Sequence, residues 1–136
     1  MRRARSTTAM LGLALAATLG LTAAEAQTAA KPSSRCFLSQ DWNGWKATED
    51  SRSMYIRVGL KSLYRVDFAG MCPRLQSPGA HLVTRVRGSS WICSPLDLDI
   101  KVSDGPPGDI ATPCIAKAIT PLSAEEAAAL PKKLKP

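Results

Sequence analysis

The sequence predicts a small all-β domain, mainly antiparallel, stapled by disulfides and followed by one short C-terminal helix. Four cysteines follow an apolar leader, short segments of alternating polar and apolar residues recur, and no helical period separates those segments. Alternation with a period of two is typical of strands with one buried face. The lack of intervening helices excludes parallel βαβ units. We therefore expect five or six short strands in a small barrel or sandwich, with a partly open, oligonucleotide-binding-type barrel as one candidate.

The N-terminus has the three parts of a secretion signal. Three arginines lie within the first five residues, an apolar run extends from Ala9 to Leu21, and small residues at Ala24 and Ala26 flank a glutamate. We expect cleavage after Ala26, which makes residues 1–26 a signal peptide and the protein periplasmic or secreted. The alternative is a retained membrane anchor, but the run is shorter than the roughly 20 residues of a spanning helix.

The rest of the chain has the size of one domain. Cleavage leaves 110 residues with 15 basic and 10 acidic side chains, a net charge of about +5. Such a charge favours an anionic ligand, although it is also ordinary for the solubility of an exported protein. Export disfavours nucleic acid as a partner. The remaining candidate partners are an anionic ligand and an envelope protein. No pattern indicates a cofactor.

Composition divides this part of the chain into three. Residues 27–34 are small and polar and predict a disordered lead-in. Residues 35–130 form the predicted domain, and 131–136 form a basic tail. Ser123 and Glu126 have the spacing of a capping box, so we expect a helix over 124–130 that stops at Pro131.

Six segments carry strand signals, and the clearest two form a predicted hairpin. Ser53–Val58 and Tyr64–Phe68 place their apolar residues on one common face if Ile56 lies opposite Val66. On the other face, this register places Tyr55 opposite Asp67 and Arg57 opposite Arg65. Between the first strand and this hairpin, the Asn-Gly pair at 43–44 predicts a turn. The other expected strands are 36–38, 81–86, 96–102 and 114–119.

The cysteines are expected to form two disulfides, because an even count in an exported chain indicates pairing. No Cys-x-x-Cys spacing suggests zinc or redox chemistry. Four cysteines allow three connectivities. Cys72 ends a strand to which Cys93 returns after a turn, and Cys36 and Cys114 open the first and last strands. We therefore predict the pairs Cys72–Cys93 and Cys36–Cys114.

Two groups of residues are candidates for binding. Trp42 and Trp45 could form an exposed stacking platform or could close one end of the core. A set of basic side chains with one aromatic could bind an anion, or could be a solvated sheet face with Asp67 as a counter-ion. That set consists of Tyr55, Arg57, Arg65, Arg85 and Arg87.

Catalytic signals are weak, and we expect a protein without enzymatic activity. Asp97 and Asp99 share a predicted strand face and could hold Ca²⁺ or act as an acid/base pair, but no third ligand is identifiable. His81 is the one histidine, and no Gly-x-Ser-x-Gly motif or free thiol accompanies it. We predict neither a catalytic residue nor a metal site.

Several short motifs from residue 35 onward carry a family resemblance. They are Arg35-Cys36-Phe37, Asp41-Trp42-Asn43-Gly44-Trp45, Tyr64-Arg65-Val66-Asp67, Cys72-Pro73, Ile92-Cys93-Ser94, Asp97-Leu98-Asp99, Pro113-Cys114-Ile115 and Leu122-Ser123-Ala124-Glu125-Glu126. By these motifs the chain from about residue 35 onward resembles an uncharacterised bacterial family of small exported proteins with a domain of unknown function. The resemblance implies export and paired cysteines, and it implies no activity.

The sequence leaves three hypotheses for the function. The first is a non-catalytic β-domain that binds a ligand or supports the envelope. The second is an inhibitor or adaptor that presents the loop 104–113, and the third is a small hydrolase that uses His81 or Asp97 and Asp99.

Overall fold

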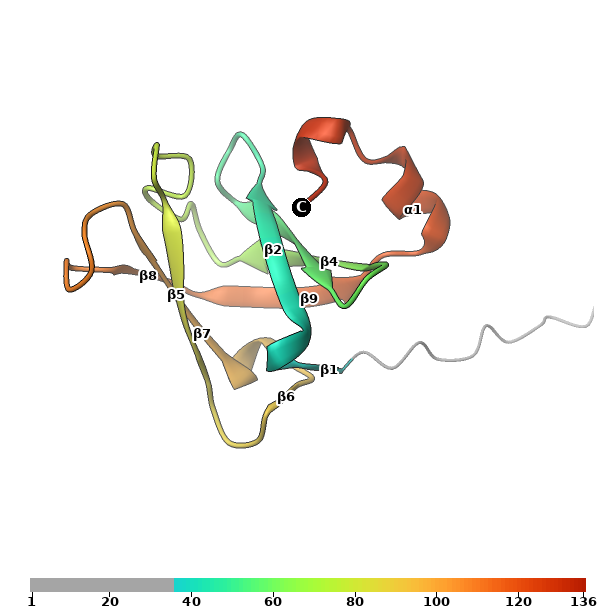
Figure 1. The fold of residues 1–136 in the computed structure, drawn as a ribbon, viewed down its shortest axis with the longest axis horizontal. Coiled ribbons are helices and arrows are strands. Elements are labelled where there is room, and N and C mark those ends of the chain that lie inside the picture. Colours follow the sequence, from blue (N-terminus) through green and yellow to red (C-terminus); the bar gives the residue numbers. More distant parts are fainter. Residues whose placement is uncertain (1–35) are drawn as a thin grey trace, which may run out of the picture.

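A computed structural model describes residues 36–136 (Figure 1). The predicted signal peptide, the lead-in and Arg35 lie outside the described residues. Within them the chain forms nine short strands, all paired antiparallel, and one short α-helix, which confirms the predicted class. The expected number of five or six strands is wrong, because residues 42–47 and 91–92 are also strands and the predicted last strand is divided in two. The strands are β1 (Phe37–Leu38), β2 (Trp42–Ala47), β3 (Ser53–Val58), β4 (Ser62–Phe68), β5 (His81–Val86), β6 (Trp91–Ile92), β7 (Leu98–Ser103), β8 (Thr112–Cys114) and β9 (Ala116–Pro121).

The strands form two main sheets and one small ladder. The first sheet has the order β2-β3-β4-β9, the second has the order β5-β7-β8, and β1 pairs with β6. The predicted last strand, 114–119, is wrong as a single strand. It is broken at the exposed Ile115 because β8 pairs with β7 while β9 pairs with β4.

The break at Ile115 links the two sheets along one side, and no ladder links them along the other. The described strands therefore run in the series β2-β3-β4-β9, break, β8-β7-β5. The two ends of the series, β2 and β5, have no ladder between them, so the barrel is not closed. We call the gap between the edges of β2 and β5 the open seam.

One core fills the space between the sheets. Side chains from both main sheets and from the β1–β6 ladder are at most 1% exposed, and the Phe37 ring packs against the Tyr64 ring with centroids 4.9 Å apart. The ladder thus closes one end of the core. The most deeply buried aliphatic side chains are Met54, Ile56, Val66, Ile92, Ile100 and Val102.

The predicted hairpin exists, but its predicted register is wrong by two positions. Only residues 59–61 connect the strands, so Ile56 lies opposite Tyr64 and Arg57 opposite Leu63. A shift of two residues keeps every side chain on its own face, and the core face is therefore as predicted. Arg57 and Arg65 therefore do not face each other, because Tyr55 lies opposite Arg65 instead.

The predicted turn at 42–45 is a strand. β2 runs straight through the Asn-Gly pair, and the register with β3 shifts between Trp42 and Gly44, as in a bulge. The Asn43 side chain donates to the carbonyls of Asp41 (2.9 Å) and Gly59 (3.1 Å), and Gly44 has φ +156°. The Asn-Gly pair therefore accommodates one extra residue in a strand instead of reversing the chain.

The strand expected over 96–102 begins two residues later than predicted. Pro95–Asp97 form a 3₁₀ turn, and β7 begins at Leu98. Leu96 is consequently 82% exposed, while Leu98, Ile100 and Val102 are buried as predicted. The strand face shared by Asp97 and Asp99 in the prediction does not form, because Asp97 lies in the turn.

The C-terminal helix α1 (Ala124–Ala129) is close to the predicted one. The Ser123 hydroxyl accepts from the Glu126 amide (3.1 Å), and the Glu126 carboxylate accepts from the Ser123 amide (2.7 Å). The capping box is therefore confirmed. After Pro131 the basic tail forms a 3₁₀ turn, Lys132–Leu134, and Lys133 forms an ion pair with Glu49.

Both disulfides exist, but the predicted pairing is wrong. The bonds are Cys36–Cys93 and Cys72–Cys114. Cys36 precedes β1 and Cys93 follows β6, so the β1–β6 ladder brings these two together. The other pair meets because β4 runs beside β9, with the Ala69 amide donating to the Ile115 carbonyl at 2.9 Å. Two disulfides in a chain of this size indicate an oxidising compartment outside the cytoplasm.

Candidate binding site at the open seam

Two adjoining hollows meet at Trp45: one lies in the open seam, and the other lies between β2 and residues 75–80, which precede β5. The first has a volume of about 390 Å³ and the second about 380 Å³. We call the two together the seam trough. The first is lined by Ser39, Trp42, Gly44, Trp45, His81, Leu82 and Thr84, and the second by Trp45, Lys46, Ala47, Leu75, Gln76, Ser77, Gly79, Ala80 and Lys133.

The two tryptophans of the predicted platform both line the trough. They are half-buried and pack against the core, and the Trp42 indole N–H donates to the Gly44 carbonyl at 3.0 Å. The structure therefore combines the two interpretations: each indole contributes to the core and also presents surface to the seam. An indole with its N–H satisfied offers mainly its apolar ring to a ligand.

His81 also lines the trough, but the structure does not bring it to the aspartates. His81 lies opposite Ser103 on β7, whereas Asp99 lies opposite Arg85, near the other end of the strand pair. Among residues 36–136, no three His, Cys, Asp or Glu side chains are grouped so that they could hold a metal ion.

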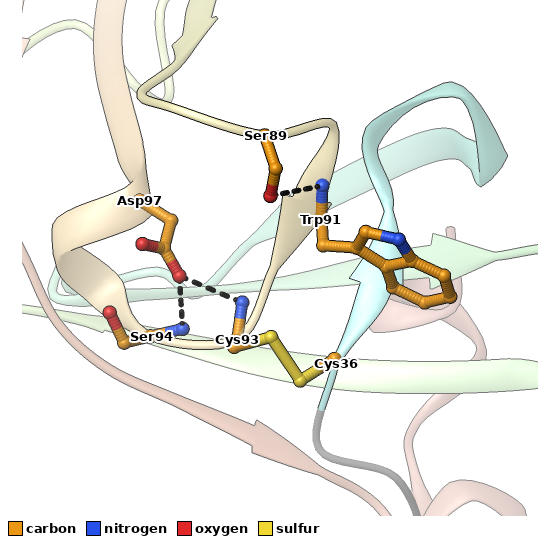
Figure 2. The surroundings of a disulfide bond; sticks show 6 residues. All are labelled: Cys36, Ser89, Trp91, Cys93, Ser94 and Asp97. Carbon is orange, nitrogen blue, oxygen red and sulfur yellow. Dashed lines mark hydrogen bonds between the residues drawn. A yellow bond between two sulfur atoms is a disulfide. The ribbon is translucent and has the colours of Figure 1, made fainter.

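Asp97 has a local structural role. Its carboxylate accepts from the backbone amides of Cys93 (2.9 Å) and Ser94 (2.8 Å), directly beside the Cys36–Cys93 disulfide (Figure 2). These hydrogen bonds to the charged form hold the pKa of Asp97 below its ordinary value. Asp99 lies 4.0 Å from the guanidinium of the exposed Arg87.

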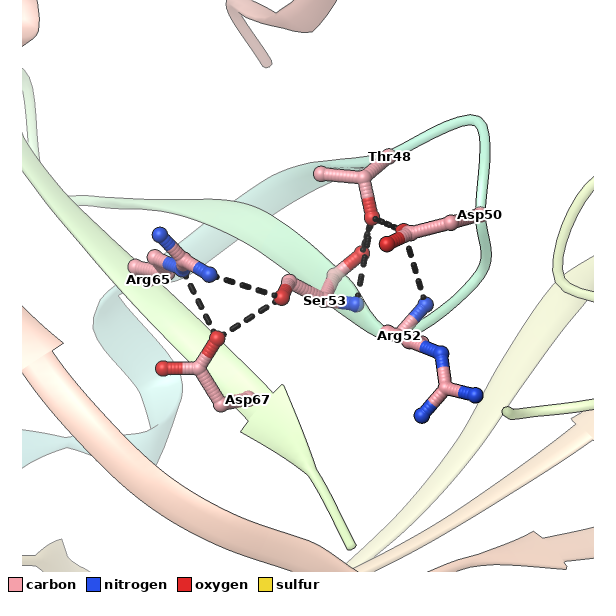
Figure 3. Close-up of polar contacts among 6 residues, drawn as sticks. All are labelled: Thr48, Asp50, Arg52, Ser53, Arg65 and Asp67. Carbon is pink, nitrogen blue, oxygen red and sulfur yellow. Dashed lines mark hydrogen bonds and ion pairs between the residues drawn. The ribbon is translucent and has the colours of Figure 1, made fainter. Parts of the chain in front are cut away.

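The predicted basic set is divided between the two sheets. Tyr55, Arg57 and Arg65 belong to β3 and β4, whereas Arg85 lies on β5 and Arg87 directly follows it. On the first sheet, Arg65 pairs with Asp67 (2.7 Å) and also donates to the Ser53 hydroxyl (3.2 Å; Figure 3).

Neighbouring groups limit what this set offers to an anion. Tyr55 is 9% exposed, Arg65 is held by Asp67, and Arg87 faces Asp99. Arg57 is the member of the set that is exposed on the first sheet and has no ion pair among the described residues.

Sequence reasoning missed two lysines of the trough. Lys46 follows Trp45 on β2, and Lys133 reaches the same hollow from the C-terminal tail. No carboxylate lines either hollow among the residues that the structure describes. The alternation Trp45-Lys46-Ala47 is the signal that could have extended the strand, and hence the site, past the Asn-Gly pair.

The loop proposed for an inhibitor or adaptor is tied at both ends. Arg74 pairs with Asp104 at 2.9 Å at one end, and the Cys72–Cys114 disulfide holds the other. Between them Ile110 is 83% exposed.

Within residues 36–136 no helix has the length and apolar character needed to cross a bilayer.

Comparisons with known proteins identify the family. No curated protein and no solved structure matches the chain. A family match covers residues 1–135, and the chain belongs to the family of unknown function DUF6491.

Proposed function

We propose that this protein is an exported, non-catalytic binding domain and that its contact site is the seam trough. One observation carries the proposal: the two sheets fail to meet at β2 and β5, and both tryptophans of β2 line the resulting hollow. A binding site needs apolar surface that the fold itself leaves accessible, and an unclosed seam supplies it. The four paired cysteines support export.

The trough has the features of a ligand site. Each hollow lies within the range of about 300–1,000 Å³ that is usual for ligand pockets. Its walls combine aromatic and aliphatic surface from Trp42, Trp45 and Leu82 with polar groups from Thr84 and His81. Partly exposed tryptophans are frequent where binding energy is concentrated.

Chemical-shift mapping tests which surface binds. The ¹⁵N-labelled, disulfide-bonded protein is titrated with a defined panel of short peptides, oligosaccharides and nucleotides. We expect the responding amides to cluster at 42–47 and 81–84. If they cluster instead around Arg57 and Arg65, or in the loop 104–113, the seam is not the contact site.

Two substitutions on one strand provide a matched comparison. Thr84→Arg places a long side chain into the trough, while Val83→Arg adds the same charge on the next residue of β5, which lies on the opposite face. We expect only Thr84→Arg to abolish the shifts. Mass spectrometry of the same mixtures tests the non-catalytic part, because conversion of any probe would contradict it.

A second candidate function is an adaptor that presents the loop 104–113 to a protein. The exposed Ile110, on a loop held at both ends by Asp104 and Cys114, favours it. Replacing residues 105–111 with a Gly-Ser segment of equal length separates the candidates. We expect binding at the seam to survive this replacement, and its loss would favour the adaptor.

A further inference from the structure

We infer that the seam trough binds an extended peptide segment of a partner protein, which adds as a strand between β2 and β5. This inference rests on the proposed function and names the class of ligand for the same site. Strand addition needs a row of unpaired backbone N–H and C=O groups on a sheet edge. The phase of the hydrogen bonds along β2 and β5 shows which residues supply them.

On β2, two of the residues that line the trough turn their backbone groups to the free edge. The Thr48 amide donates to the Ser53 carbonyl at 2.9 Å, and these two residues continue the register of β2 and β3. Opposed residues of an antiparallel pair alternate between hydrogen-bonded and non-hydrogen-bonded. Lys46 therefore bonds to β3, and the backbone groups of Trp45 and Ala47 point to the free edge.

The same argument applies to β5. The Arg87 amide donates to the Asp97 carbonyl at 2.7 Å, in register with β5 and β7. Alternation from that pair places the backbone groups of Leu82, Thr84 and Val86 on the free edge. Leu82 and Thr84 line the trough opposite Trp45. Both walls of the seam thus carry the donors and acceptors that an inserted strand requires.

The size and direction of the walls set the geometry of the segment. The trough follows β2 from Trp42 to Ala47, with β5 as the opposite wall of the first hollow and residues 75–80 as the opposite wall of the second. An extended segment of about six residues spans this length at roughly 3.3 Å per residue. Trp42 shares a hollow with Thr84 and Ala47 shares one with Ala80, so β2 and β5 run in opposite directions. The segment is then antiparallel to one wall and parallel to the other.

Charge and burial set the chemistry of the segment. Lys46 and Lys133 line the end near Ala47; Lys133 is paired with Glu49, whereas Lys46 has no ion pair within residues 36–136. An acidic residue at that end of the segment is therefore complementary. Trp45 and Leu82 face the seam beside the core, so side chains that point inward from the segment are apolar, at every second position.

Selection from a peptide library tests the inference. The probe is a phage-displayed library of random octapeptides with an aspartate fixed at each end, and selected peptides are synthesised and titrated by calorimetry. We expect them to alternate apolar and polar residues. N-methylation of alternate amides in such a peptide should weaken binding by about tenfold or more. Each methyl group replaces an N–H donor of the peptide and leaves a carbonyl of the strand edge without its hydrogen bond.

Variants of Thr84 isolate the backbone contribution. Thr84→Pro removes one outward N–H from the edge of β5 without removing a donor to β7, since proline is tolerated on the free side of an edge strand. Thr84→Val keeps the N–H and changes only the side chain. We expect a loss of affinity of about tenfold for Thr84→Pro and less than about threefold for Thr84→Val. Circular dichroism confirms that Thr84→Pro is folded, and the N-methylated peptides decide the matter if it is not.

Each contrary outcome has its own meaning. Equal affinity for unmodified and N-methylated peptides, or no enrichment over the Thr84→Arg protein, overturns strand addition. If oligosaccharides shift the seam amides while peptides do not, the trough remains the contact site and only this inference fails. If no probe of any class shifts them, the proposed function itself fails. A dimer in sedimentation that Thr84→Pro converts to a monomer makes a second copy of the chain the occupant and also overturns the inference.

Discussion

Cys36 and Cys93 form a disulfide directly outside the two-residue ladder of β1 and β6. Two residue pairs, Phe37 with Ile92 and Leu38 with Trp91, could not hold such a ladder alone, because short isolated strand pairs are marginally stable in water. The disulfide fixes the ladder, and the ladder fixes the Phe37 ring against the core. The other disulfide has a different setting, since both of its cysteines are buried between β4 and β8.

This difference predicts the order of reduction. Cys93 is exposed, whereas Cys72 and Cys114 are 1% and 5% exposed. A thiolate must reach a sulfur atom to reduce a disulfide, so we expect graded dithiothreitol to open Cys36–Cys93 first while the fold persists. Alkylation followed by peptide mass spectrometry reads the order. Earlier reduction of Cys72–Cys114 would contradict the burial argument.

A second prediction concerns acid stability. Hydrogen bonds from Cys93 and Ser94 lower the pKa of Asp97 in the folded state, so the unfolded chain takes up this proton at a higher pH than the folded protein does. Asp97 therefore stabilises the fold above its ordinary pKa, and this contribution is lost as the pH falls below about 4 toward the lowered value. We expect Asp97→Asn to lower Tm at pH 7 and to make the decline of Tm below pH 4 shallower.

Glu125→Gln is the matched control for Asp97→Asn. It removes one negative charge from an exposed carboxylate that has no hydrogen bond within residues 36–136. We expect its Tm profile to stay parallel to that of the wild type. Glu49, Asp50 and Glu126 also have lowered pKa values through their hydrogen bonds. The Tm of Asp97→Asn should therefore still fall below about pH 4, but by less than the Tm of the wild type.

A third prediction tests where β7 begins. Ile100 is 1% exposed in the core, whereas Leu96 is 82% exposed in the 3₁₀ turn. We expect Ile100→Ala to lower the free energy of unfolding by about 2–5 kcal/mol and Leu96→Ala to change it by less than about 0.5 kcal/mol. Chemical denaturation measures both. A comparable loss for both variants would mean that Leu96 belongs to the strand face, as alternation alone predicts.

The case of Leu96 shows how far local pattern predicts this fold. Alternation correctly predicts the buried face at Met54, Ile56 and Val66 and at Leu98 onward, because burial on one side of a strand is a local property. It extends β7 two residues too far because Pro95 begins a 3₁₀ turn in which Asp97 accepts backbone amides. A pattern of apolar residues carries no signal for that turn.

Non-local features were beyond the sequence for a different reason. The cysteine pairing depends on the ladder of β1 with β6, two strands of two residues each, and such short segments carry almost no periodic signal. The seam depends on β2 and β5 not pairing, which is a property of the whole strand order. Trp42 and Trp45 were identifiable as candidate binding residues, but their neighbours Lys133 and Leu82 come from segments far away in the chain.

A fourth prediction separates general basicity from specific anion binding. Asp67 accepts hydrogen bonds from Arg65 and from the Ser53 hydroxyl, both at 2.7 Å, and holds the arginine along the sheet (Figure 3). Asp67→Asn removes the charge but keeps an oxygen acceptor for Ser53. We expect this variant to elute from heparin at higher salt than the wild type, because Arg65 loses its counter-ion.

Asp109→Asn makes the same change of net charge in the loop 104–113, far from Arg65 in the sequence. If the outer face of β3 and β4 contacts polyanions, Asp67→Asn shifts elution more than Asp109→Asn does. Equal shifts would show that heparin senses net charge alone. In either case Arg57→Ala combined with Arg65→Ala should leave peptide affinity at the seam within about twofold of the wild type, since the side chain of neither arginine lines the trough.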